Sequence, residues 1–359
     1  MGHMSKWFTK KWVLFIAVLA ILEGLASVFN PYDHVPKANL DTRKQITQSG
    51  WPEYLEIPKK GNQKRIIFIG NSQTVGYEMR DSSQTYFGIL RDYAKKKNTD
   101  FDLQNWSTGG VRMAEMQILT AKAIVEKADK IVFLIHADNF DLADNINLNF
   151  IDSDVKLLLA ENDVYQTVKH MELGKRIDVV DQFDAWMERN VGLLRWRRYW
   201  LNQSTILTAE KNDVFWYGNT INDGQVIDFK RFPSQYEAYM KHWHRPERIN
   251  VKMDDLDTAY ATSRLESFLR FEKDLRELSS LYDFEYEFIW TPYYTPAYSK
   301  ETRELVDEFF IEPSIRRGNH VYNLTYSVDS TGFLSRAHFN QEGHRKFADQ
   351  LLKHWSDDF

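Results

Sequence analysis

Ser72 and His338 have the side-chain types and the sequence positions for nucleophilic catalysis. Ser72 closes a Gly-Asn-Ser turn after the apolar, β-branched run at residues 66–69, which puts its hydroxyl at the tip of a predicted strand. His338 stands just ahead of a predicted helix at residues 341–355. A serine hydroxyl is a weak nucleophile until a base takes its proton, and histidine is the commonest base for that task. The two residues therefore indicate acyl-transfer chemistry if the fold brings them together.

Predicted strands and helices alternate around Ser72. The strands lie at residues 65–69, 101–106 and 130–135, and the helices at residues 83–98 and 112–127. This β-α-β-α-β order predicts an α/β fold with a doubly wound parallel sheet and helices on both faces, a three-layer, flavodoxin-like arrangement. An open sheet of this kind gathers the residues that follow its strands on one edge. Ser72 and His338 can therefore meet there.

The C-terminal part of the chain continues the pattern, and the middle interrupts it. A long amphipathic helix is predicted at residues 255–281, a strand and turn at 285–296, and a short strand at 321–325. We therefore predict one α/β domain made of residues 64–140 and 255–359. Residues 141–254 are mixed in charge and rich in aromatic residues, and they are too long for a structureless loop in a compact domain. They predict a mostly helical insertion.

Four segments of the chain resemble the sequence blocks of the SGNH hydrolases, also called the GDSL family. Gly70-Asn71-Ser72 is similar to the block that carries the nucleophile. NWSTGG at residues 105–110 resembles the second block, with Gly110 at the oxyanion position. Asn139 matches the oxyanion asparagine of the third block, although Asp138 and Phe140 replace the family's glycine and aspartate on either side. The resemblance implies an ester-processing serine enzyme that needs no metal or organic cofactor.

The last of these blocks contains His338 and departs from the family at one position. The family has an aspartate three residues before the histidine, and this chain has Ser335 there. That aspartate normally orients the imidazole and stabilises its charged form. Three alternatives stay open: Asp329, the nearest upstream acid, takes the role; the site is a Ser-His dyad; or the chain no longer catalyses.

Composition excludes several classes of function. The 359-residue chain is 43% hydrophobic, which allows a sizeable core. A net charge of −5 lacks the basic surface that nucleic-acid binding requires. The chain has no cysteine, so disulfides and thiolate zinc sites are excluded. Aromatic residues make up 14% of the chain, which favours a large aromatic core or, alternatively, stacking platforms for sugar rings.

The N-terminal region predicts a membrane anchor. Residues 1–11 combine a Met-Gly-His-Met start typical of an expression tag with a lysine-rich cytoplasmic tail. Residues 12–29 are apolar except for Glu23 and Ser27, and as a helix they would extend about 27 Å, enough to cross a bilayer. The run is longer than a signal peptide needs and lacks a good cleavage site, which favours an uncleaved anchor. Residues 30–63 are polar and proline-containing and predict a tether.

The lysines before residue 12 predict a cytoplasmic N-terminus and an extracytoplasmic body at a bacterial cytoplasmic membrane. Glu23 is costly in lipid, so we expect it to face a membrane partner. This layout resembles the membrane-anchored SGNH-like proteins of teichoic-acid D-alanylation and alginate acetylation. The resemblance implies a polytopic membrane O-acyltransferase as partner and acyl esters of an envelope polysaccharide as substrate. The alternatives are a lipase, thioesterase or deacetylase, and a non-catalytic module that binds glycan or a partner.

Overall fold

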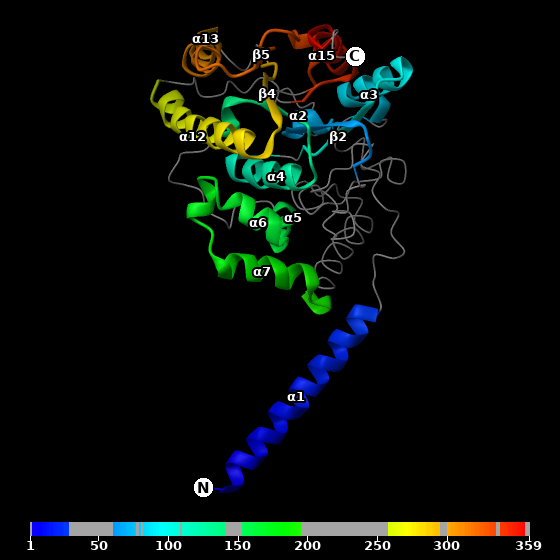
Figure 1. Ribbon diagram of the computed structural model, residues 1–359, viewed down its shortest axis with the longest axis vertical. Coiled ribbons are helices and arrows are strands. Elements are labelled where there is room, and N and C mark those ends of the chain that lie inside the picture. The colour runs from blue at the N-terminus through cyan, green and yellow to red at the C-terminus, as the bar shows by residue number, and fades with distance from the viewer. Residues whose placement is uncertain are drawn as a thin grey trace.

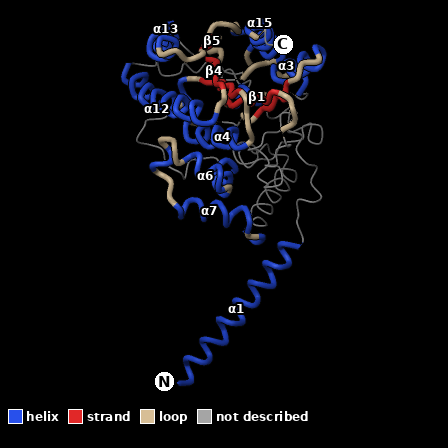
Figure 2. Tube along the Cα trace, viewed as in Figure 1, coloured by secondary structure: helices blue, strands red, loops and turns tan. Residues whose placement is uncertain are grey.

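A five-stranded parallel sheet forms the centre of the protein, as seen in a computed structural model (Figures 1 and 2). The strands are β1 (Lys64–Gly70), β2 (Phe101–Asn105), β3 (Lys130–Ile135), β4 (Glu285–Trp290) and β5 (Val321–Asn323). The structure describes residues 2–28, 60–76, 79, 82–107, 110–140, 153–194, 258–294, 300–334 and 338–355. The prediction of a parallel α/β sheet is confirmed, with strand positions that differ from the expected ones by at most two residues at either end.

The strand order explains where ligands can approach the sheet. The order is β2-β1-β3-β4-β5, which is one of the common doubly wound arrangements. In β1, Phe68 pairs with Asn105 of β2 on one side and with Val132 of β3 on the other. The chain therefore turns one way after β1 and the other way after β2. Doubly wound sheets bind ligands at such a switch point, outside the carboxyl ends of the strands.

Helices cover both faces of the sheet, as expected (Figure 1). On one face are α3 (Tyr86–Lys97) and α15 (Gln341–His354), and on the other are α4 (Met113–Val125) and α12 (Thr258–Tyr282). Phe68 packs edge-on against Trp355, at the end of α15, and Phe133 packs edge-on against Phe271 of α12. All four side chains are buried. Aromatic rings thus supply much of the core on both sides of the sheet, as composition suggested.

The described part of the insertion is helical. It contains α5 (Ser153–Lys156), α6 (Asn162–Val168) and α7 (Val179–Asn190), with 3-10 turns at Leu157–Ala160 and Leu173–Lys175. Residues 141–152 and 195–257 lie outside the described residues. A further helical stretch follows β4 and was not predicted: α13 (Lys300–Val306), a π-helical turn (Asp307–Ile311) and α14 (Glu312–Arg316).

The N-terminal helix α1 (Gly2–Val28) contains most of the segment predicted as an anchor. In the described parts of the chain, no helix is both long enough and apolar enough to cross a membrane. The structure also corrects the expectation for Glu23. Its carboxylate accepts hydrogen bonds from the backbone N–H groups of Gly192 (2.6 Å) and Leu193 (3.0 Å), so its partner lies within this chain. Of the tether predicted at residues 30–63, residues 60–63 are described.

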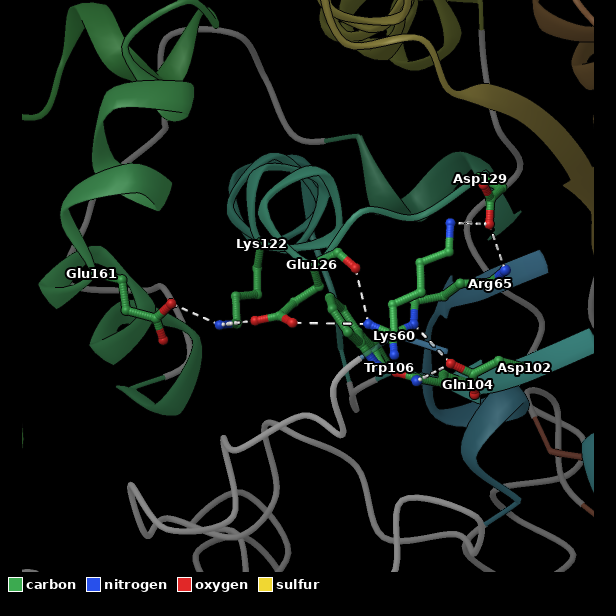
Figure 3. A network of polar contacts seen from close by, with 9 residues as sticks. All are labelled: Lys60, Arg65, Asp102, Gln104, Trp106, Lys122, Glu126, Asp129 and Glu161. Atoms are coloured by element: carbon green, nitrogen blue, oxygen red, sulfur yellow. Dashed lines mark hydrogen bonds and ion pairs between the residues drawn. The ribbon is translucent and has the colours of Figure 1, made fainter. Parts of the chain in front are cut away.

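Charged side chains concentrate at the amino end of the sheet (Figure 3). Arg65 is buried and donates from Nε to Asp102 Oδ2 (2.7 Å) and from Nη1 to the carbonyl oxygen of Glu126 (2.9 Å). Lys122 in α4 then bridges Glu126 (2.7 Å) and Glu161 of the insertion (2.6 Å). This chain of ion pairs links β1 and β2 to α4 and to the insertion, at the end of the sheet opposite Ser72.

Candidate active site

Ser72 lies at the switch point of the sheet, directly after β1. It is the first residue of the short helix α2 (Ser72–Val75) and is partly exposed. Asn71 is the N-cap residue, because its side-chain oxygen accepts a hydrogen bond from Gln73 N (3.0 Å). The cap role that serine often plays after a strand is thus taken by Asn71. The hydroxyl of Ser72 therefore does not cap α2 and can contact a residue elsewhere in the fold.

His338 comes from the loop before α15, and the loop is held by backbone contacts. Leu334 N donates to the carbonyl oxygen of His338 (2.8 Å), and Asn340 N donates to that of Gly332 (3.0 Å). A Cβ at Gly343 would lie 1.9 Å from the Gly332 oxygen, so only glycine allows α15 to approach the loop this closely. The side chain of Asn340 caps α15 by accepting from Gly343 N (2.9 Å). These contacts set the position of His338 relative to the sheet.

The structure brings Ser72 and His338 together. His338 Nε2 lies 2.9 Å from Ser72 Oγ, although the residues are 266 positions apart in the chain. His338 is buried, which limits the positions its ring can take. For Nε2 to accept the serine proton, the ring proton must be on Nδ1. The pair has the geometry required of a nucleophile and its general base.

Asn139 and the Gly110 turn lie beside each other, across the loops that follow β2 and β3. Asn139 is buried; its Nδ2 donates to the carbonyl oxygen of Val111 (2.7 Å) and its Oδ1 accepts from His136 N (2.6 Å). Gly110 is exposed and has a φ of +68°, a backbone conformation that favours glycine. Among the described residues, no hydrogen bond joins Ser72 to either residue. The hydrogen bond from Asn139 to Val111 therefore holds the turn at Gly110 against the loop after β3. An oxyanion role for Gly110 and Asn139 stays a prediction.

Asp329, the predicted orienting acid, is engaged away from His338. Its Oδ1 accepts hydrogen bonds from the backbone and hydroxyl of Thr331, and its Oδ2 pairs with Lys346 at 2.6 Å. The Lys346 hydrogen bond and those of Thr331 hold the pKa of the Asp329 carboxyl at about 2. Both oxygens are thus occupied, in the described part of the chain, by partners other than His338. Ser335, where the family has its aspartate, lies outside the described residues.

Two further contacts at this edge involve Gln73 and His136. Gln73, which follows Ser72, is buried and donates from Nε2 to the carbonyl oxygen of Pro292 (3.2 Å), tying α2 to the loop after β4. His136, at the end of β3, stacks on Tyr293 with ring centroids 3.8 Å apart. Polar residues directly after strands were the available signal for both. Their partners come from the β4 loop, which no local pattern could identify.

A buried tyrosine supports the histidine side of the site. Tyr86 at the start of α3 is fully buried, and its backbone N–H donates to Nδ1 of His344 in α15 (3.3 Å). The two rings also stack, with centroids 6.0 Å apart. Burial raises the pKa of the Tyr86 phenol far above its usual range, so the group stays neutral. Because α15 follows His338 directly, this contact helps to hold the loop of His338 against α3.

Comparison with known proteins identifies no family for this chain. No family model and no curated protein matches it. Among solved structures, a crystal structure of an acetyl xylan esterase is similar at 12% sequence identity, with a TM-score of 0.27, covering 81% of this chain and 98% of that one. A likeness at this score carries no argument about activity. The functional case therefore rests on the geometry around Ser72.

Proposed function

We propose that the protein is an SGNH-like serine esterase or O-acyltransferase, with Ser72 as nucleophile and His338 as general base. The observation that supports this best is the 2.9 Å contact between Ser72 Oγ and His338 Nε2 at the carboxyl edge of a doubly wound sheet. Ser72 Oγ attacks the acyl carbonyl carbon while its proton passes to Nε2. The tetrahedral oxyanion then collapses, the ester C–O bond breaks, and the leaving alcohol takes the proton from the imidazolium.

The acyl-Ser72 ester formed in this way is released by a second attack. An acceptor hydroxyl gives its proton to His338 and attacks the same carbonyl carbon. The bond between that carbon and Ser72 Oγ then breaks, and the imidazolium returns the proton to Oγ. If the acceptor is water, the protein is an esterase, and if it is a sugar hydroxyl, the protein is an acyltransferase. The two reactions share every residue of the site, so the acceptor alone distinguishes them.

The oxyanion in this proposal is stabilised by the backbone N–H groups of Ser72 and Gly110 and by the side chain of Asn139. Asn139 Nδ2 carries two hydrogens, and the carbonyl oxygen of Val111 accepts one of them. The second hydrogen is then available to the substrate. Donors of this kind are often worth about 3–4 kcal/mol each in the transition state.

We further propose that the protein acts at the outer face of a bacterial cytoplasmic membrane, on acyl esters of an envelope polysaccharide. The apolar composition of residues 12–29 supports membrane attachment, as do the apolar side chains that α1 exposes, including Phe15, Ile16 and Ile21. The polysaccharide and a polytopic O-acyltransferase partner are supported by the likeness in layout to other anchored SGNH-like proteins. The site geometry is equally compatible with a lipase, thioesterase or deacetylase.

Covalent labelling tests the proposed nucleophile directly. A fluorophosphonate should modify the wild-type protein, and peptide mass mapping should place the adduct on Ser72. The Ser72→Ala variant should not be labelled, while Ser280→Ala, which removes an exposed serine on α12, should label like wild type. A wild-type protein that never reacts, alongside a serine esterase that does, would leave the non-catalytic binding module as the better description.

A partition experiment separates hydrolysis from transfer. The protein is supplied with a small activated ester, with and without an oligosaccharide acceptor, and the acyl group is followed into free acid and acylated sugar. A transferase should yield acylated sugar in proportion to acceptor concentration. An esterase should yield free acid at all acceptor concentrations.

A further inference from the structure

Helix α7 turns its apolar residues outward. Val179, Val180, Phe183 and Trp186 are all exposed, with 55% of the Phe183 surface and 45% of the Trp186 surface accessible. On the opposite side of the helix, Ala185 is buried. A surface helix normally packs its apolar stripe against the core, and α7 has the reverse arrangement. An exposed patch of this kind marks an interaction surface.

Two of the four exposed side chains form a stacked aromatic pair. The rings of Phe183 and Trp186 are stacked, with centroids 6.0 Å apart and an interplanar angle of 17°. On the inner side, Arg189 pairs with Glu161 at 2.8 Å, which ties α7 to the start of α6 and, through Lys122, to the ion-pair chain of the sheet. The helix is therefore anchored by its polar side while its apolar side has no cover among the described residues.

Helix α1 also exposes apolar side chains, and it contacts the chain just after α7. Glu23 of α1 accepts hydrogen bonds from Gly192 and Leu193, directly after α7. Figure 1 shows α7 at the end of the body from which α1 projects. From Trp12 to Val28, α1 exposes large apolar side chains on all sides, as helices do that are surrounded by lipid or protein. The exposed apolar side chains of α7 and of α1 therefore belong to helices at the same end of the molecule.

The composition of α7 favours a lipid surface with neutral headgroups. Phenylalanine and tryptophan suit the boundary between headgroups and acyl chains. Interfacial helices that bind anionic lipids carry lysine and arginine on their polar side, whereas acidic residues predominate here. The acidic residues are Asp178, Asp181, Asp184 and Glu188, against a single base, Arg189.

We propose that α7 lies in the plane of a zwitterionic lipid surface, with Val179, Val180, Phe183 and Trp186 at the boundary between headgroups and acyl chains and α1 beside it. Two apolar helices at one end then fix how the body is oriented on the membrane. The inference rests on the membrane setting proposed above and is independent of the chemistry of Ser72.

Site-directed spin labels test this contact in the full chain, which has no cysteine of its own. Single-cysteine variants are labelled at Phe183→Cys in α7, at Leu19→Cys in α1, and at Leu281→Cys as a control. Leu281 lies near the C-terminal end of α12 and is 65% exposed. Each protein is reconstituted in phosphatidylcholine vesicles. Relaxation of the label by a water-soluble nickel chelate and by oxygen, which partitions into lipid, is then compared.

In vesicles, the labels at positions 183 and 19 should lose their response to the chelate and respond strongly to oxygen, and the label at position 281 should keep its chelate response. Raising the salt concentration should not release the label at position 183 from the lipid, and adding phosphatidylglycerol should not strengthen its protection from the chelate.

Protection of the label at position 19 with free chelate access at position 183 overturns the α7 proposal and leaves the membrane setting intact. Access at both positions overturns the membrane setting itself. Protection at 183 without any lipid would instead mean that a second copy or another segment of the chain covers α7.

Discussion

The two ends of the central sheet are built on different principles. At the carboxyl end, Ser72 and His338 are joined by one side-chain hydrogen bond and are positioned by caps and backbone contacts. At the amino end, Arg65 and Glu287 are buried charges with several partners each. One end holds a hydroxyl and an imidazole in contact, the pair that the proposed reaction uses. The other end uses its charged groups to hold strands and helices together.

The difference means that the same kind of substitution should have opposite effects at the two ends. A buried ion pair that loses one partner leaves an uncompensated charge, which is strongly destabilising. Loss of Ser72 or His338 removes only one hydrogen bond from the fold, but in the proposed mechanism it removes the nucleophile or its base. Activity and stability should therefore respond separately to changes at the two ends.

The largest expected effect is on activity at the carboxyl end. Ser72→Ala and His338→Ala should each lower kcat for a small activated ester by about 10⁴-fold or more, because the proposed mechanism uses the two residues as one unit. For the same reason the double variant should be no worse than either single one. The thermal midpoint should stay close to that of wild type. Losses that multiply in the double variant would show that His338 is not the base for Ser72.

The second effect concerns acid stability at the amino end. Burial would raise the pKa of Glu287, but the hydrogen bond from His354 and the charge of Lys130 outweigh it and lower the pKa to about 2. The Glu287 carboxyl binds a proton more tightly in the unfolded chain than in the folded protein. The ionised carboxylate therefore stabilises the fold at pH values above its pKa in the unfolded chain. That stability, about 3 kcal/mol, should be lost as the pH falls from about 4.5 toward 2.

Denaturant unfolding at a series of pH values measures this dependence. Glu287→Gln should flatten the curve below pH 4.5. Glu285→Gln, on the same strand but exposed, should leave the curve as in wild type. If the two variants have the same acid response, the buried cluster at Glu287 is not the source of it.

Removing the central arginine gives the third effect. Arg65→Met should lower the free energy of unfolding by roughly 2–3 kcal/mol. This is no more than the smallest loss usual when a buried ion pair loses one partner, because Asp102 and Glu126 keep some contact with water. The kcat of the folded variant should be unchanged. Lys64→Met is the matched control, since its pair with Glu285 is exposed and 3.5 Å long, and it should cost less than about 1 kcal/mol. A drop in kcat for Arg65→Met at full folding would contradict the separation of the two ends.

The smallest effect tests the acid that does not reach the histidine. Asp329→Asn keeps an oxygen for the Thr331 N–H and loses only the exposed pair with Lys346. Both kcat and the thermal midpoint should match those of wild type. A large loss of kcat at an unchanged midpoint would restore Asp329 as the group that orients His338.

Regular elements of this protein were predictable because their signals are local. The β-branched run before Ser72, the helical periodicity around Tyr86 and the apolar strand ending at Ile135 each depend on neighbouring residues, and all three appear where expected. The helical stretch from Lys300 to Arg316 was missed. It contains a π-helical turn, and a proline lies near the start of α14. Both interrupt the periodicity on which a helix prediction rests.

The sequence by itself determined the parallel α/β architecture and the two residues that could react, because strand periodicity, the Gly-Asn-Ser turn and the position of His338 before a helix can all be read along the chain. Only the tertiary structure decided which side chains meet. It brought Ser72 to His338, held Asp329 on Lys346, and gave Glu23 a partner at Gly192 and Leu193. These contacts join residues that are distant in sequence, and their geometry depends on how strands and helices pack, which no local pattern contains.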